Sequence, residues 1–386
     1  MDVFDQLQPV SYALTEWAHE LPQQALGRKL LINTGDIFPM PKDIALAILA
    51  IDDSVTNDTT RDYVDFDKIR KTLYELYTGD WDAKIIDLGT FVISDPQEPS
   101  TNALTQLIES LVKRNVIPIL LGGSQSYLYQ QYEAYKHLEQ LVNVLNIDQC
   151  FDIGDAGTAL NAHNTIGKMI VDKPTILFNY ANLGYQSFLN TQEEIQLLDS
   201  LHFESLRLGA LKADISAAET LMRDADIVSL DFNSIKSIET GFATTHQPNG
   251  FDGLEVCALA RYAGISDKVS SFSIFEIKQN RHAEIAEHLI SQIIWYFIEG
   301  FHNRMHDYPF TSKADYKRFI VAQTDQEMVF YQSPISGRWW MEIPNTNSGV
   351  HTKTTSNTLI PCNHQDYLDA CENVIPDRWW KAFNKF

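Results

Sequence analysis

The sequence predicts an α/β fold built on a mostly parallel sheet, and two observations support this prediction. Short apolar runs rich in Ile, Val and Leu recur along the middle of the chain, and longer segments with helical spacing of apolar residues separate them. Helical crossovers of this length join parallel strands, and the resulting sheet is covered by helices on both faces. In such sheets ligands bind outside the carboxyl ends of the strands.

The predicted strands are apolar runs bounded by turn-forming or polar residues. They are expected at residues 44–51, 83–89, 116–123, 142–148, 175–180, 206–210, 226–232 and 269–277. Their near-continuous hydrophobicity is typical of strands that are buried on both faces.

The predicted helices carry apolar residues three or four positions apart. Ile69, Leu73 and Leu76 form one such stripe. Helices are expected at residues 65–77, 101–115, 126–138, 215–225, 254–264, where Gly264 closes the helix, and 282–301.

The alternation of strands and helices stops near residue 303, which predicts a main domain over 1–303 and an extension over 304–386 packed on it. The extension reads as aromatic and irregular apart from a hairpin at 327–342, whose turn contains Pro and Gly. Arg-Trp-Trp occurs at 338–340 and again at 378–380. We favour packing of these Trp residues onto the main domain, because exposed aromatic tails lower solubility. A protein-binding surface, for which Trp and Arg are typical, is the alternative.

The charge balance disfavours two classes of partner. With 30 basic and 51 acidic residues the chain carries a net charge of -21, which argues against nucleic acid and against anionic membranes. It suits a basic partner or bound cations, although a solvated acidic exterior is the first explanation. The four cysteines are widely spaced, as in reduced cytosolic proteins. We see neither a signal-peptide pattern nor a membrane-length apolar run, so we expect a cytoplasmic protein without membrane insertion.

Carboxylates follow several of the predicted strands. Asp148 and Asp152 lie after one strand, Asp231 ends another, and Glu276 ends a third. Such groups converge on one crevice, where they repel one another unless a cation or a proton neutralises them. Each aspartate alone is explained by a helix cap or a turn, whereas the set together predicts a site.

The order of these segments resembles a known family. GGSQS, DQCFD, SLDFN and FEI occur in the order in which the ureohydrolases (arginase, agmatinase and formimidoylglutamase) carry Gly-Gly-Asp-His-Ser, Asp-Ala-His-x-Asp and Ser-x-Asp-x-Asp. The resemblance covers roughly residues 40 to 300. It implies the three-layer α/β/α arginase fold, and a homo-oligomer, since members often form trimers or hexamers.

The departures from the family pattern concern metal binding. Members bind two manganese ions through histidines and aspartates, and the resemblance assigns those roles here to Asp148, Asp152 and Asp231. The positions of the remaining ligands hold Gln125, Cys150 and Asn233.

Two further residues take roles from the resemblance. Glu276 corresponds to the glutamate that binds a substrate guanidinium group. His163 lies where some members carry a proton-shuttling histidine, although an ordinary surface or core histidine is the favoured explanation.

These replacements limit the expected cofactor to none or a single divalent cation (Mn, Mg or Ca) bound by oxygens. Cysteine is too soft a ligand for these ions. Lys236, near the third motif, offers a fixed positive charge in place of a second metal.

Three functions therefore stay open. The first is a ureohydrolase-like protein without two-manganese activity, acting as a scaffold, a partner-binding or a ligand-sensing protein. The second is a divergent hydrolase of a C–N bond in a guanidino or formimino substrate with at most one metal. The third uses Cys150 as a nucleophile and ranks last, because flanking aspartates raise a thiol pKa.

Overall fold

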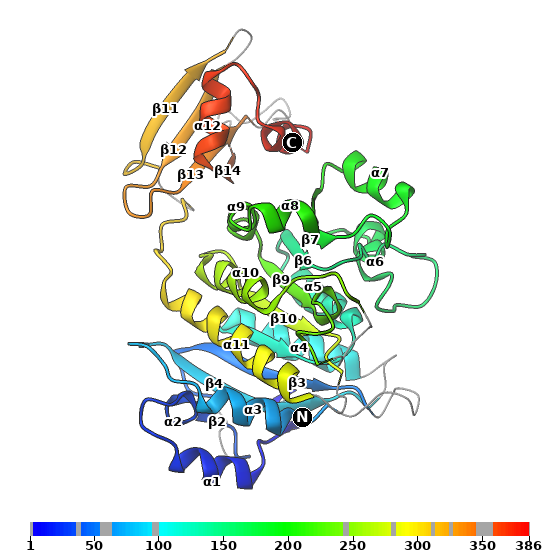
Figure 1. Cartoon of the computed structure of the whole chain (residues 1–386), viewed down its shortest axis with the longest axis vertical. Helices are drawn as coiled ribbons and strands as arrows, with labels where there is room; N and C mark the ends of the chain where they lie inside the picture. The colour runs from blue at the N-terminus through cyan, green and yellow to red at the C-terminus, as the bar shows by residue number, and fades with distance from the viewer. Residues whose placement is uncertain are drawn as a thin grey trace.

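The computed structural model describes residues 3–35, 40–54, 64–94, 100–241, 247–278, 283–309, 313–323, 327–344 and 358–385. Within these ranges the chain forms one large, mostly parallel sheet and one small antiparallel sheet (Figure 1).

The large sheet has the strand order β1-β4-β3-β5-β10-β9-β6-β7-β8, with β2 also paired to β4. Its pairs are parallel except for β1 against β4. The strands are β1 (Leu7–Gln8), β2 (Leu31–Ile32), β3 (Ile44–Asp52), β4 (Lys84–Val92), β5 (Ile117–Leu121), β6 (Val142–Ile147), β7 (Leu177–Tyr185), β8 (Glu204–Arg207), β9 (Ile227–Asp231) and β10 (Ser271–Phe275).

Helices cover both faces of this sheet and form two separate cores. Along β3, Leu46 and Ile48 face one core while Ala47 and Leu49 face the other, as the two-residue period of a strand requires. The first core packs against α1 (Tyr12–Glu20), α2 (Leu26–Lys29), α3 (Phe66–Glu75), α8 (Leu208–Ala213), α9 (Ala217–Met222), α10 (Gly253–Ile265) and α11 (Ala283–His302). The second packs against α4 (Ser100–Lys113), α5 (Leu128–Lys136), α6 (Thr165–Val171) and α7 (Gln192–Ser200). The predicted three-layer α/β/α fold is confirmed.

Two predicted element ends are corrected by the structure. The strand expected at 206–210 ends at Arg207, because Leu208 and Leu211 are buried three positions apart on the helix α8. Gly264 does not close α10, which continues to Ile265. A Cβ at Gly264 would lie 2.1 Å from the carbonyl oxygen of Phe297, so this glycine allows α10 and α11 to approach closely.

The expectation of an irregular extension was wrong. Residues after α11 form a four-stranded antiparallel sheet, β11-β12-β13-β14, that is followed by two helices. The predicted hairpin is present as β12 and β13. The elements are β11 (Lys317–Ala322), β12 (Glu327–Gln332), β13 (Trp339–Ile343), β14 (Thr358–Cys362), α12 (His364–Cys371) and α13 (Asp377–Phe383). The sequence signal for these strands is the alternation of buried and exposed residues in short segments separated by turns. That signal is weak in segments so rich in aromatic residues.

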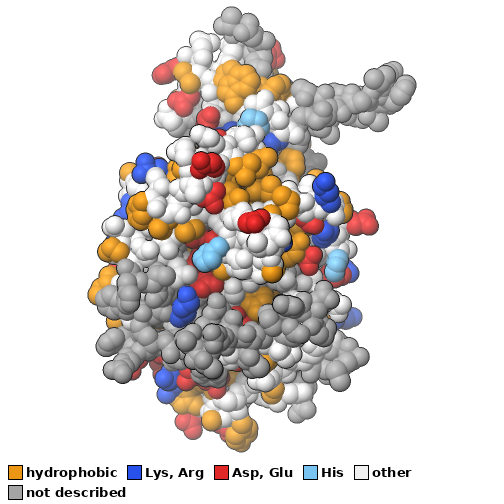
Figure 2. Space-filling view, turned by 90° about the vertical axis from the view of Figure 1, so that its right-hand side faces the viewer, with side chains coloured by type: hydrophobic (Ala, Val, Ile, Leu, Met, Phe, Trp, Pro, Cys, Tyr) orange, Lys and Arg blue, Asp and Glu red, His pale blue; other side chains and the backbone are white. Residues whose placement is uncertain are grey.

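The small sheet has a core of its own, in which Trp339 and Trp379 are buried. Trp340 is fully buried and lies against the guanidinium of Arg223, while Trp380 is 45% exposed. Figure 1 shows the small sheet at one end of the molecule, beside α8 and α9, and Figure 2 shows hydrophobic side chains gathered just below it.

Arg223, which follows α9, links the two sheets. Its guanidinium donates hydrogen bonds to the carbonyl oxygens of Trp339 (3.0 Å) and Cys362 (2.7 Å), and its Nε donates to Glu219 (3.0 Å).

Among the described helices, none is long and apolar enough to span a membrane.

Candidate metal centre

The residues of the predicted site lie at the carboxyl ends of four neighbouring strands, β5, β10, β9 and β6. Asp148 directly follows β6 and Asp152 lies in the loop beyond it. Asp231 is the last residue of β9, and Glu276 directly follows β10. Gln125 opens the short 3-10 helix η2 (Gln125–Tyr127) after β5. Parallel strands bring their carboxyl ends to one edge, which is why segments about 150 residues apart meet here.

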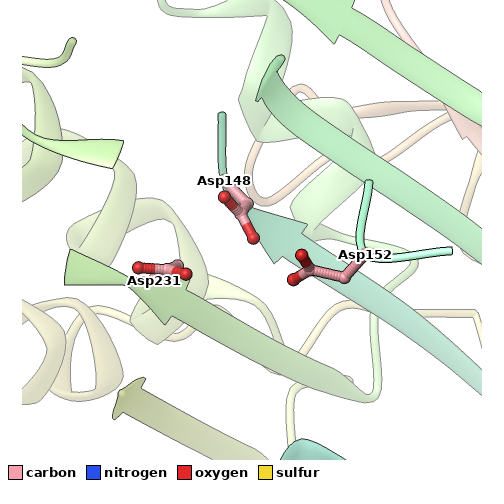
Figure 3. A group of neighbouring side chains, drawn as sticks. All are labelled: Asp148, Asp152 and Asp231. Carbon is pink, nitrogen blue, oxygen red and sulfur yellow. The ribbon is translucent and has the colours of Figure 1, made fainter. Parts of the chain in front are cut away.

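Three of these carboxylates form one cluster. Ligand oxygens of Asp148, Asp152 and Asp231 lie within 4.8 Å of one another, and all three residues are buried. Figure 3 shows their carboxylates turned toward a common space between the strand ends.

Burial and mutual repulsion perturb all three acids. Loss of solvent contact is the main cause that raises the pKa of Asp148, Asp152 and Asp231 well above the ordinary range. Repulsion from the neighbouring carboxylates adds to the rise in each pKa. The cluster therefore favours a bound proton or a bound cation.

Two of the aspartates are held by hydrogen bonds to their own loops. The backbone N–H of Cys150 donates to Asp148 Oδ1 (3.0 Å), and the backbone N–H of Asn233 donates to Asp231 Oδ1 (2.6 Å). In contrast, Oδ2 of Asp152 is buried without a hydrogen-bond partner among the described residues. Asp152 also has a left-handed backbone, with φ of 53°, a conformation that Asp and Asn tolerate better than most residues.

Gln125, which follows β5 at the same edge of the sheet, has a side-chain oxygen without a partner among the residues that the structure describes. Its Nε2 donates to Asn146 Oδ1 (3.0 Å) and lies 3.4 Å from Ser229 Oγ, which directs the amide nitrogen into the sheet. Its Oε1 is buried and, within the described ranges, accepts no hydrogen bond. An amide oxygen is a hard ligand that suits the same cations as a carboxylate.

The other two altered positions are poorer ligands. Burial is the main cause that raises the pKa of the Cys150 thiol, and the nearby aspartates raise it further, so the thiol stays protonated at neutral pH. Asn233 contributes a neutral side chain whose Oδ1 is buried and, in the part of the chain described, lacks a hydrogen-bond partner. The Asn233 oxygen is a hard ligand, as that of Gln125 is, whereas the Cys150 thiol is soft, so these two positions together supply one neutral hard ligand.

Glu276 is buried and already has partners on both carboxylate oxygens. Oε1 accepts the backbone N–H of Gln125 (2.9 Å), and Oε2 lies 3.3 Å from the ammonium of Lys278. Glu276 has a φ of 58° and, like Asp152, is a non-glycine residue with a left-handed backbone at this edge. Such strained positions concentrate at functional sites.

Lys278 is a site residue that the sequence interpretation missed. A lysine two residues after a strand-end glutamate is no signal by itself, because their contact depends on the left-handed backbone of Glu276. Lys236, which the sequence analysis placed near the crevice, instead pairs with Asp252 at 3.6 Å. Asn146, whose Nδ2 donates to Asp148 Oδ2 (3.1 Å), was also missed, although it lies two residues before Asp148.

His163 lies at the rim of the site. Its Nδ1 is 4.0 Å from Asp152 Oδ1, but its side chain is 90% exposed. The histidine can therefore approach the aspartate cluster from solvent without belonging to it.

The donor set fits a hard cation. Asp148, Asp152, Asp231 and the oxygen of Gln125 would hold it, and the partnerless oxygens of Asp152 and Gln125 are where ligand bonds would form.

Known proteins resemble both the sequence and the fold. The sequence model of the arginase family matches residues 60–299. The formimidoylglutamase of Clostridium tetani is 23% identical over 214 residues, covering 51% of this chain and 63% of that protein. The formimidoylglutamase of a Geobacillus strain is 24% identical over 190 residues, covering 47% and 58%. The chain thus matches less than two thirds of the length of these curated relatives.

The fold is shared with solved structures of the same kind. The crystal structure of Trypanosoma cruzi formiminoglutamase with Mn²⁺ superposes with a TM-score of 0.61 at 14% identity, over 69% of this chain and 97% of that one. At this identity the likeness concerns the fold. Since the family match extends over most of the chain and the site lies inside it, the protein belongs to the arginase family.

Proposed function

We propose that this arginase-family protein has lost two-manganese hydrolysis and acts as a non-catalytic scaffold, partner-binding or ligand-sensing protein. The observation that carries the proposal is the donor set at Cys150 and Asn233. A soft thiol and a neutral amide stand where a second cation would need hard, charged ligands.

The charge of the cluster supports the same conclusion. Three carboxylates carry at most three negative charges, whereas two divalent ions bring four positive ones into a buried site. Buried charges that are not compensated are costly. A single divalent ion leaves the cluster close to neutral and is the occupant that the charges favour.

The partners of Glu276 also oppose the ordinary use of this site. A cationic guanidino or formimino group would have to displace the ammonium of Lys278 from Oε2. The lysine therefore competes with such substrates for the carboxylate that would bind them.

A second candidate, a one-metal hydrolase of a C–N bond, is favoured by one observation. Asp152 Oδ2 and Gln125 Oε1 are buried and partnerless in the described structure, as ligands prepared for a cation would be. A bound cation would polarise a substrate carbonyl or imine or acidify a water molecule. Asp148 and Asp231 would hold that ion in place, and the exposed His163 at the rim would exchange protons with solvent.

One experiment separates the two candidates. The purified chain is loaded with excess MnCl₂, desalted and analysed for bound metal, and its hydrolysis of formiminoglutamate, arginine and agmatine is then measured. We expect at most one Mn²⁺ per chain and no turnover. One bound ion with turnover that Asp152→Asn abolishes would establish the one-metal hydrolase, and two bound ions with turnover would refute both candidates.

A restored variant provides the matched control. Gln125→His, Cys150→His and Asn233→Asp together return the family's ligand types to the three altered positions. We expect this variant to bind a second Mn²⁺, because the remaining ligands already surround the space. Retention of a single ion would show that the loss of the second site has causes beyond these side chains.

The Trp residues of the extension offer a smaller exposed surface to a protein partner than the sequence suggested. Of the four Trp residues in the two Arg-Trp-Trp segments, Trp380 alone is substantially exposed. A protein partner of the extension would therefore contact Trp380 and its surroundings on α13. A homo-oligomer and a cytoplasmic location remain proposals that sedimentation and cell fractionation can test.

A further inference from the structure

A second pocket lies at the amino ends of the strands of the large sheet, whereas the aspartate cluster lies at their carboxyl ends. The space between its walls, with the open solvent at its mouth included, is about 600 Å³. One wall consists of the amino ends of β6, β7 and β8, together with the segment before β9, and the other comes from β14 and α13. The pocket thus exists because the extension covers the sheet, since the family match ends at residue 299.

The lining combines an apolar body with three basic side chains. The apolar part includes Val144, Leu145, Leu221 and Ile360. The basic residues Arg378, Lys381 and Lys385 all come from α13 or the residues that follow it. This concentration of positive charge is unusual in a chain whose net charge is -21.

Each of the two acids that line the pocket is paired with a lysine, and for Glu204 this is Lys381 of the same lining. Glu204 forms an ion pair with Lys381 (2.9 Å), and Asp224 forms one with Lys268 (3.2 Å). Over the described residues, no ion pair joins Arg378 or Lys385 to a carboxylate. Arg378 donates to the carbonyl oxygen of Pro361 (3.1 Å), and Lys385 donates to Asn179 Oδ1.

Lys385 has a buried ammonium group whose charge a bound anion would stabilise. Its ammonium lies 5.1 Å from the centre of the Phe203 ring, and burial lowers its pKa to about 8. Glu204 and Asp224 favour the charged form of this ammonium, but no carboxylate of the described residues lies within ion-pair distance of it, so it lacks a direct counter-charge. A bound anion would supply it through charge-assisted hydrogen bonds.

We propose that this pocket binds a small carboxylate with an apolar body, using Lys385 and Arg378 for the carboxylate and the sheet residues for the apolar part. Such a ligand would bridge the main domain and the extension. The site is independent of the proposed loss of hydrolysis, because the pocket and the aspartate cluster occupy opposite ends of the strands.

The test uses hexanoate as the probe, titrated by calorimetry into the full chain in EDTA so that no cation at the aspartate cluster contributes. Hexanamide, hexylamine and inorganic phosphate are titrated in parallel. We expect hexanoate to bind about tenfold or more tightly than each of them, because only hexanoate has both the charge and the apolar body. Equal binding of hexanoate and hexanamide, or of hexanoate and phosphate, would overturn the proposal. The absence of hexanoate binding up to about 10 mM would overturn it as well.

Three variants locate the binding. The double variant Arg378→Gln/Lys385→Gln should weaken hexanoate about tenfold or more. Ala382→Trp should also weaken it, because the indole fills the pocket while every cation remains. Lys42→Gln, an exposed lysine outside the pocket, should leave the affinity unchanged. Unaltered hexanoate binding in both the double variant and Ala382→Trp would place the ligand elsewhere and refute the assignment.

Discussion

The two edges of the large sheet differ in how their buried charges are balanced. At the carboxyl edge, Asp148, Asp152 and Asp231 lie together, and the basic side chain that contacts this edge in the described structure is Lys278, through Glu276. At the amino edge, acidic and basic side chains form ion pairs. Lys381 pairs with Glu204, and Lys268 pairs with Asp224.

The carboxyl edge is therefore a site under electrostatic strain, whereas the amino edge is an interface that stabilises the fold. The carboxyl edge keeps like charges in one buried space, which is costly unless a proton or a cation is bound. At the amino edge each of these acids has a basic partner, and the Lys381–Glu204 pair joins the extension to the main domain. Four predictions test this contrast, beginning with the largest expected effect.

The first prediction concerns Arg223→Leu. The substitution leaves the carbonyl oxygens of Trp339 and Cys362 without their buried donor and removes the cation beside Trp340. The free energy of unfolding should fall by about 3 kcal/mol, and protease cleavage should begin in the extension. Urea denaturation measures the first effect and mass spectrometry of the fragments the second. Arg318→Leu, on the exposed side of β11, is the control and should change the unfolding free energy by less than about 0.5 kcal/mol.

The second prediction is that Asp152→Asn stabilises the metal-free protein, by about 1–2 kcal/mol. The change removes one of three repelling carboxylates, and Asn accepts the left-handed backbone of this position. Thermal unfolding in EDTA measures it. The exposed Asp199→Asn is the control and should have little effect. Destabilisation by Asp152→Asn would show that the cluster is not strained by its charge.

The third prediction is a pH dependence of the metal-free protein. Because burial raises the pKa of the cluster aspartates in the folded state, the folded chain holds protons that the unfolded chain has released at neutral pH. Stability should therefore rise as the pH falls from 8 toward the ordinary pKa of Asp, by about 1.4 kcal/mol per pH unit for each extra proton held.

Two controls assign this pH effect to the cluster. The chain's overall negative charge acts in the same direction, so the slope must become shallower in Asp152→Asn and when MnCl₂ replaces EDTA. A slope that is the same under all three conditions would attribute the effect to the surface charge instead.

The smallest predicted effect is that of Lys381→Met. Its pair with Glu204 at the amino edge is partly buried, so its loss should cost about 0.5–1 kcal/mol in urea denaturation. The effect should shrink at high salt, because salt screens an ion pair of this kind. A salt-independent loss would mean that the lysine acts through packing alone.

Most of the large sheet was predictable from the sequence because both of its faces are buried. Strands such as β3 and β5 are apolar at nearly every position, and helices such as α3 carry clear apolar stripes. The small sheet was harder to predict, since its strands are short and half exposed, as in β11, and aromatic residues obscure the alternation. The correction at 208–210 has a similar origin, because a short apolar run fits a helix as well as a strand.

The candidate site was predictable at the level of residue type and order. Asp148, Asp152 and Asp231 were named from their positions after strands, and the structure brings them together. Lys278 and Asn146 were missed because a lysine or an asparagine near a strand end is common and carries no signal by itself. Their contacts depend on side-chain directions that are set by the strand register and by the left-handed backbone of Glu276.

The sequence by itself determined which chemical groups this protein can offer a metal: three carboxylates and an amide, with a thiol and a second amide where family members carry stronger ligands. That conclusion follows from residue identity, which folding does not alter. Only the tertiary structure decided which charges are compensated, because compensation depends on distance and burial. It directed Lys278 to Glu276 and Lys236 to Asp252, and it set Arg378 and Lys385 against the amino edge of the sheet. Residues far apart in the chain acquire these partners through the order of the strands, which local sequence patterns do not encode.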